Sequence, residues 1–233
     1  MKTSNRLKIA ALSAVLPLAA LSSAQAATSL NFVLPDNVGY ESILNYYNGG
    51  ADQNGAIGPN YGITFGSDAL ALLNANQPND VGSNVGNEPG GGNAMIFLSG
   101  VGDVMDVAGG FNTGFSFYYA APGYAGSVSV YSGLDGTGTL LASIPLPVTG
   151  GGPGPGLYSL WDPVGVTFAG TAESAIFSGD ANYIAFADVT IGSGTPQIGN
   201  NVPDNTGVGI YALAALALAG AGWASRKQKI AAI

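Results

Sequence analysis

The chain has 233 residues with 14 Asp and Glu, six Lys and Arg, and neither His nor Cys, giving a formal net charge of −8 at pH 7. Without cysteine it can form no disulfide, and without histidine it has neither the commonest metal ligand nor the usual proton-transfer group at neutral pH. The same absences exclude Ser-His-Asp and Cys-His catalytic systems.

The N-terminal segment has the three parts of a secretory signal. Three basic residues precede residue 9, an apolar run covers residues 9–21, and Ala24 and Ala26 supply the small-residue pattern that signal peptidase accepts. The apolar run is too short to span a bilayer well. We therefore predict a cleaved signal peptide over residues 1–26 and an exported mature chain.

Charge is distributed very unevenly along the chain. All six Lys and Arg lie in the two terminal segments, whereas residues 27–201 contain thirteen acidic side chains and no basic one. Such a domain repels nucleic acid, since binding a phosphate backbone needs Lys and Arg. A close pair of carboxylates in it must be separated, protonated or bridged by a cation, and calcium suits oxygen ligands.

Residues 27–194 predict one β domain. Short alternating apolar runs stand between stretches rich in Gly, Asn, Thr and Ser, which is the pattern of strands and turns. Asp135-Gly136 predicts a tight turn, and residues 82–93 and 150–156 predict loops. Residues 68–73 suit either a strand or a helix. The expected strands are residues 30–34, 42–47, 61–65, 95–98, 104–108, 114–119, 127–131, 139–142, 164–168, 174–177 and 183–191. This number of strands predicts an antiparallel β-sandwich.

A polar linker over residues 195–207 leads to an apolar segment. Residues 208–225 contain no charge, and as a helix they would be about 27 Å long, close to the thickness of the hydrocarbon core. The absence of any polar face argues against a buried amphipathic helix. The basic cluster of Arg226, Lys227 and Lys229 follows at once and predicts a cytoplasmic tail over residues 226–233.

The order of these parts resembles the sorting tail of PEP-CTERM proteins, which exosortase-type enzymes process. The motif residues are Val202, Pro203, Asp204 and Gly207, followed by the membrane helix and the basic cluster. Asp204 stands where the family usually has Glu, as in Val-Pro-Asp variants. The resemblance implies an intermediate anchored in the inner membrane, then release to the cell surface or the extracellular space.

The β domain also resembles sandwich domains found ahead of such tails. The similar stretches are residues 61–66, 109–119, 130–139 and 161–166, and residues 183–190 resemble the last strand of galactose-binding-like jelly rolls. The resemblance implies a jelly-roll-like β-sandwich at an extracellular location and carries no particular chemistry.

Two binding chemistries are open. Asp36, Glu41 and Asp188 lie at the two ends of the domain, whose first and last strands are often neighbours in jelly rolls, so they are candidates to share a structural calcium ion; otherwise they are solvated surface acids. Exposed aromatics could stack on sugar rings, although aromatics in a sandwich are more often core residues. The aromatic candidates are Tyr40, Tyr46, Tyr47, Tyr61, Tyr124 and Trp161.

A structural or adhesive surface or matrix protein, not an enzyme, is the function the sequence favours. The alternative is a carbohydrate-binding module for exopolysaccharide. A secreted glycoside hydrolase is the least favoured, because the nearest carboxylate pair, Asp103 and Asp106, would point to opposite faces of one strand.

Processing of the tail is directly testable. We expect the mature protein, isolated from a strain with active sorting, to begin at Ala27 and to end between Pro203 and Gly207, as measured by intact mass. Recovery of a form that still ends at Ile233 would contradict the sorting prediction.

Overall fold

The computed structural model describes residues 26–76, 84–152, 154 and 156–198. The rest of the predicted signal peptide, the sorting motif, the predicted membrane helix and the basic cluster lie outside these residues. Within the part that is described, no helix is long and apolar enough to cross a membrane.

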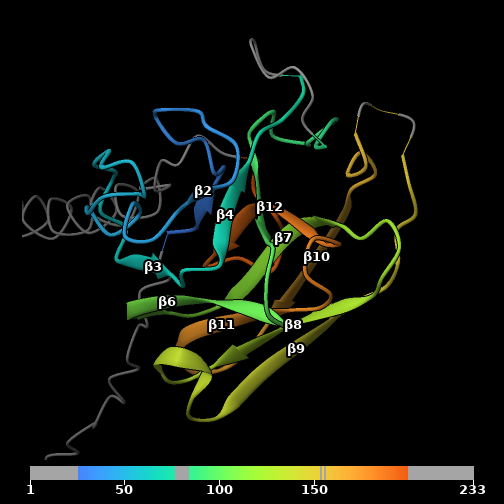
Figure 1. Ribbon diagram of the computed structural model, residues 1–233. Helices are drawn as coiled ribbons and strands as arrows, with labels where there is room; N and C mark the ends of the chain where they lie inside the picture. The colour runs from blue at the N-terminus through green and yellow to red at the C-terminus, as the bar shows by residue number, and fades with distance from the viewer. Residues whose placement is uncertain (1–25, 77–83, 153, 155, 199–233) are drawn as a thin grey trace, which may run out of the picture.

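The described residues form a β-sandwich of two antiparallel sheets, so the all-β prediction is confirmed (Figure 1). The first sheet has the order β10 (Asp162–Thr167), β7 (Gly114–Ala120), β12 (Ala185–Ile191), β5 (Ala94–Phe97), β4 (Ala69–Leu72) and β2 (Glu41–Ser42), and β1 (Thr28–Leu30) also pairs with β12. The second sheet has the order β3 (Ile63–Phe65), β6 (Gly102–Phe111), β11 (Ala172–Ser178), β8 (Gly126–Tyr131) and β9 (Leu140–Leu146).

Aromatic side chains fill the space between the sheets. Phe115 and Phe117 of β7 and Phe186 of β12 meet Phe177 of β11, with ring centroids 4.8 to 6.1 Å apart in edge-on contacts. These four rings are fully buried. Edge-on aromatic pairs stabilise a core beyond the burial of their area. This aromatic cluster therefore fixes how the two sheets pack.

The outer face of the first sheet is covered as well. Side chains alternate along a strand, so Met95 and Phe97 of β5 enter the main core while Ala94 and Ile96 face outward. The outward side chains pack under Val85 and Tyr158, which come from two loops joined by an isolated bridge. The loops on this face are thereby anchored to the sheet.

Four expected strands are shorter than predicted: those over residues 61–65 and 183–191 begin two residues later, at Ile63 and Ala185, and two others differ more. Residues 43–47 form turns after β2, with Leu44 at φ 49°, and the first strand ends at Leu30. Tyr46 and Tyr47 explain the difference at residues 43–47: both rings belong to the same core cluster and pack on each other, whereas a strand would place adjacent side chains on opposite faces. The Tyr47 hydroxyl also accepts the Phe32 N–H at 3.0 Å, in place of a strand partner.

The structure shows which conformation residues 68–73 adopt and whether Asp135-Gly136 forms a turn. Residues 69–72 of the segment 68–73 are strand β4. Asp135-Gly136 lies in a short 3-10 turn, η1 (Leu134–Gly136), where both residues have positive φ, at 54° and 68°. The tight-turn prediction is confirmed.

Phe186 tests the role of the aromatic cluster. We expect Phe186→Ala to lower the free energy of unfolding by about 3–5 kcal/mol, because it leaves a cavity between the sheets. Denaturant unfolding of the full chain measures this change. The control Val101→Ala removes a side chain that is 83% exposed and should change stability by less than about 0.5 kcal/mol. Similar losses for the two variants would contradict the assignment.

Candidate functional site

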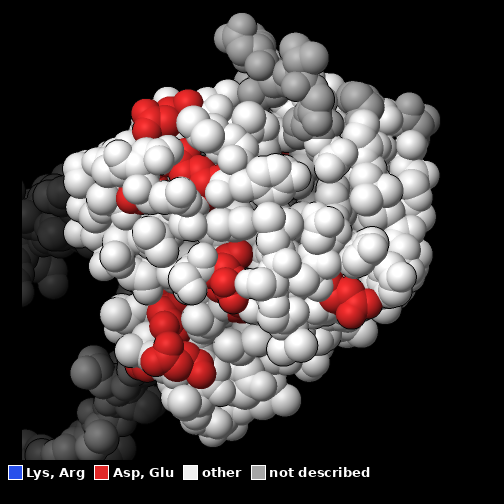
Figure 2. Space-filling view, in the orientation of Figure 1, with Lys and Arg blue, Asp and Glu red and all other residues white. Residues whose placement is uncertain are grey.

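Among the described residues, five acidic side chains are buried, in a domain without basic residues. They are Glu41, Asp52, Glu88, Asp103 and Asp188, each at most 7% exposed. Residues 26–198 contain no Lys or Arg, and the face shown in Figure 2 carries separate acidic patches and no basic one. Ionised carboxylates are costly to bury without compensation. Each buried acid must therefore obtain a hydrogen-bond donor, a proton or an external cation.

Asp188 and Glu88 form one pair. A bulge in β12, with Asp188 at φ 48°, directs its carboxyl group against Gly90, where a Cβ would lie 2.6 Å from Oδ2. The Glu88 carboxyl accepts the Gly92 N–H at 2.5 Å and hydrogen-bonds the Asp188 carboxyl. Burial raises the pKa of Glu88, against the opposing effect of these hydrogen bonds. Only glycine at position 90 lets the loop close over Asp188.

Glu41 and Asp52 form a second pair at the edge of the first sheet. Glu41 Oε1 accepts a hydrogen bond from the Asn54 amide at 2.9 Å, and Asp52 Oδ1 accepts the N–H groups of Asn54 and Ala56. Burial, together with the nearby carboxyl groups of Asp52 and Asp36, raises the pKa of Glu41 to about 7. Charge repulsion is thus concentrated at this edge.

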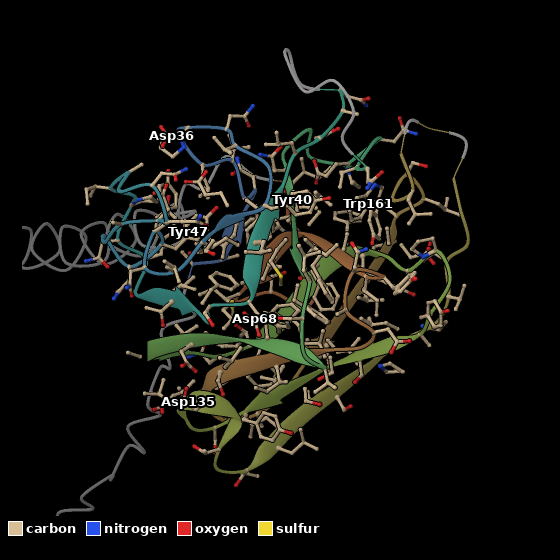
Figure 3. All side chains as sticks on the ribbon, in the orientation of Figure 1. Asp36, Tyr40, Tyr47, Asp68, Asp135 and Trp161 are labelled. Atoms are coloured by element: carbon tan, nitrogen blue, oxygen red, sulfur yellow. The ribbon has the colours of Figure 1, made fainter. Side chains whose placement is uncertain are left out.

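Asp103 and Asp106 take separate partners on and beside β6. Asp103 lines an open depression of about 410 Å³, and the N–H groups of Gly66 and Asp68 hydrogen-bond its carboxyl group. Burial raises the pKa of Asp103 to about 6. The Asp106 carboxyl accepts the Asp135 N–H at 2.8 Å. Figure 3 shows Asp68 and Asp135 on the two sides of β6.

The predicted calcium ligands Asp36, Glu41 and Asp188 are not gathered into one group. The Asp36 carboxyl group lies near Glu41 and raises its pKa, whereas Asp188 is fully buried beside Glu88. Across the described ranges, no three acidic side chains lie in a group that could hold a metal ion. Glu88 and Asp52 were missed as partners because each stands in a loop whose fold brings it to a strand distant in sequence.

Exposed tyrosines gather at one end of the sandwich. Tyr124, in the loop after β7, packs on Tyr183, in the loop before β12, with ring centroids 4.4 Å apart. Tyr158 lies beneath, and its pKa is raised by burial and then by the nearby Tyr40 and Tyr183 hydroxyls. Tyr40, Tyr124 and Tyr183 are 44%, 47% and 40% exposed. We call these three residues the tyrosine edge.

The loops that carry the tyrosine edge are held by main-chain hydrogen bonds. Asn182 has a positive φ of 63°, which Asn tolerates better than most residues. Its N–H donates to the Phe97 carbonyl at 2.8 Å, and its carbonyl accepts the Tyr158 hydroxyl. Tyr40 is fixed by its own N–H, which donates to the Ala71 carbonyl at 2.8 Å. The rings are therefore presented by pre-organised backbone.

The other predicted aromatics have structural roles. Tyr46 and Tyr47 are core residues, and Tyr61 stacks on Tyr47 with ring centroids 6.2 Å apart. Trp161 is half-buried, and its Nε1–H donates to the Gly86 carbonyl at 3.0 Å. In Figure 3 Trp161 and Tyr40 lie in the same upper part of the molecule. Tyr183 was missed because the alternating pattern placed it in the last strand, which starts two residues later.

The sequence matches no protein-family model and no curated protein. Solved structures with partial similarity include three carbohydrate-binding modules. One is a family 6 module from Clostridium stercorarium, in complex with cellobiose (18% identity, 54% of this chain, 82% of that chain, TM-score 0.34). Another is a family 6 module of a laminarinase from Zobellia galactanivorans (18%, 55%, 89%, TM-score 0.34). The third is a family 35 module from Paenibacillus barcinonensis (16%, 56%, 92%, TM-score 0.36). At TM-scores this low, the similarity carries no argument about a ligand.

Asp103 makes stability depend on pH. Its pKa rises from 3.8 to about 6 on folding, so its contribution is full below about pH 3.8 and is lost as the pH rises through 6. We expect Asp103→Asn to match the parent chain at pH 3.5 and to be more stable at pH 7.5, by at most about 3 kcal/mol. Melting temperatures across this range, with a chelator present, measure the difference.

The exposed Asp162 supplies the control for this experiment. Asp162→Asn also removes one carboxyl group, but from the surface, and should change stability little. A constant difference for Asp103→Asn across the pH range would contradict the assignment.

Proposed function

We propose that the β-sandwich is a non-catalytic domain that binds neutral polysaccharide through the tyrosine edge, and that it serves an exported protein in adhesion to a surface or matrix. The observation that carries the proposal is the gathering of Tyr40, Tyr124 and Tyr183, from three loops far apart in sequence, at one end of the domain.

Exposed aromatic groups held by a rigid backbone suit sugar rings. A sugar ring presents C–H groups on its faces, which pack on aromatic rings, and hydroxyl groups at its rim. Large aromatic side chains supply contact area at a low cost in conformational entropy. The exposed Asp180 and Asn182 stand next to Tyr183 in the same loop and can accept hydrogen bonds from hydroxyls.

The charge of the domain narrows the class of polysaccharide. With no Lys or Arg over residues 26–198, no side chain can pair with a uronate or sulfate group. Acidic side chains nearby would repel such groups. A neutral glucan, mannan or xylan fits this surface better than an anionic polymer.

A non-catalytic role is consistent with the carboxyl groups that were considered for hydrolysis. Asp103 and Asp106 are hydrogen-bonded by different main-chain segments. Glycoside hydrolysis needs two carboxyl groups that flank one scissile bond.

Export and sorting are proposed from the sequence. The signal peptide, with Ala24 and Ala26, directs the chain to signal peptidase, and Val202, Pro203, Asp204 and Gly207 resemble a motif for an exosortase-type enzyme. The membrane segment and the cluster Arg226, Lys227 and Lys229 would hold the chain in the inner membrane until processing. The domain would then act at the cell surface or in the extracellular matrix.

Binding to insoluble polysaccharides tests the proposal. We expect the full chain, in detergent, to be retained on at least one neutral polysaccharide. Tyr124→Ala and Tyr183→Ala should each weaken retention about tenfold or more, as expected for a central aromatic contact.

Tyr131→Ala is the matched control, because Tyr131 is a half-buried tyrosine on β8 of the other sheet. It should keep full retention. No retention on any neutral polysaccharide would overturn the proposal and leave a passive matrix protein. Equal losses in all three variants would overturn the assignment to the tyrosine edge.

A further inference from the structure

The loop beside β2 holds two carboxyl groups in a defined arrangement. Isolated bridges pair Asn48 with Asn60 and Ala51 with Ile57, so the chain between them folds back on itself. At its tip, Asp52 Oδ1 accepts the N–H groups of Asn54 at 3.0 Å and of Ala56 at 2.9 Å. One oxygen of Asp52 thus organises the turn, and Oδ2 is left for another partner.

Glu41 reaches the same place from β2. Its Oε1 accepts a hydrogen bond from the Asn54 amide, and its carboxyl group lies within hydrogen-bonding distance of the Asp52 carboxyl. Glu41 and Asp52 are 2% and 4% exposed. Among the residues that the structure describes, none donates a hydrogen bond to Glu41 Oε2 or to Asp52 Oδ2. Two buried oxygens of neighbouring carboxyl groups are therefore left without a donor.

The negative charge of this pair can be compensated only by a proton or a cation taken from solution. Asp36 adds a third negative charge nearby, and no Lys or Arg exists in the described part of the chain to offset any of them. Buried charges of like sign are tolerated only when they are neutralised or when they coordinate a cation.

We propose that Glu41, Asp52 and Asn54 form a calcium-binding site that ties the loop of residues 48–60 to β2. Carboxylate and amide oxygens are ligands that Ca²⁺ prefers, and its flexible coordination allows main-chain carbonyls and water to complete the set. With only two buried carboxylates as ligands, the affinity should be that of extracellular calcium modules, with a Kd of about 10⁻⁴–10⁻³ M. The site is independent of polysaccharide binding.

The second buried pair shows why the assignment is specific. Glu88 obtains main-chain N–H donors from Gly90, Gly91 and Gly92. Glu88 Oε1 also lacks a donor, but the Glu88 carboxyl group has three main-chain N–H donors, whereas the Glu41 carboxyl group has one side-chain donor, the Asn54 amide. Glu88 is therefore a matched control: a buried acid beside another acid, in a loop of the same sheet.

Calcium titration of the full chain tests the proposal. In detergent at pH 7.5, after removal of metal by a chelator, 5 mM CaCl₂ should raise the melting temperature by roughly 2–6 °C, and titration calorimetry should show one site. Mg²⁺ at the same concentration should have little effect, because it needs near-ideal octahedral geometry. Asp52→Asn keeps the acceptor of the turn and should lose the calcium response.

Glu41→Gln is a second variant that should lose the response, in case Asp52→Asn does not fold, and Glu88→Gln should keep it. A parent chain with no calcium response would overturn the proposal. So would an equal response to Mg²⁺, or a response lost in Glu88→Gln and kept in Glu41→Gln. Tyr183→Ala should bind calcium normally, so failure of the sugar assignment and failure of the calcium site give different results.

Discussion

The absence of basic side chains is the constraint on which the rest of this domain depends. In most proteins a buried carboxylate can be paired with Lys or Arg, but residues 26–198 offer neither. Burial of an unpaired charge is costly enough to unfold a marginally stable domain. The fold therefore has to supply other means of neutralising each acid that it encloses, and those means shape the loops around both sheets.

Main-chain N–H groups are the commonest of these means. The loop over Asp188 and Glu88 directs several N–H groups at the pair, and the segment that includes Gly66 does the same for Asp103. Such close approach leaves no space for a Cβ, which would lie 2.6 Å from a carboxyl oxygen at Gly90 and 2.5 Å at Gly66. Some of the 37 glycines of this chain are thus required by its buried acids. Glu88 Oε1 and Asp103 Oδ2 still lack a donor, but only at Glu41 and Asp52, among these four acids, do two such oxygens belong to adjacent carboxyl groups.

Packing against the sheets connects these acidic loops to the tyrosine edge. Tyr158 lies on the outer face of the first sheet, and its hydroxyl holds the Asn182 carbonyl. Tyr40 directly precedes Glu41, so a single short segment carries one aromatic of the edge and one acid of the pair.

The sequence alone determined the fold class, since alternation along each strand and the turn at Asp135-Gly136 are local properties that a single segment expresses. It also determined the negative charge of the domain, which argues against nucleic-acid binding. It failed at residues 43–47, where adjacent tyrosines are both buried and only the packed core could require a turn. The partners of Glu41 and Asp188, and the meeting of Tyr40, Tyr124 and Tyr183, were decided by the tertiary structure. These residues stand on loops far apart in sequence, and no local pattern records which loops two packed sheets bring to the same end.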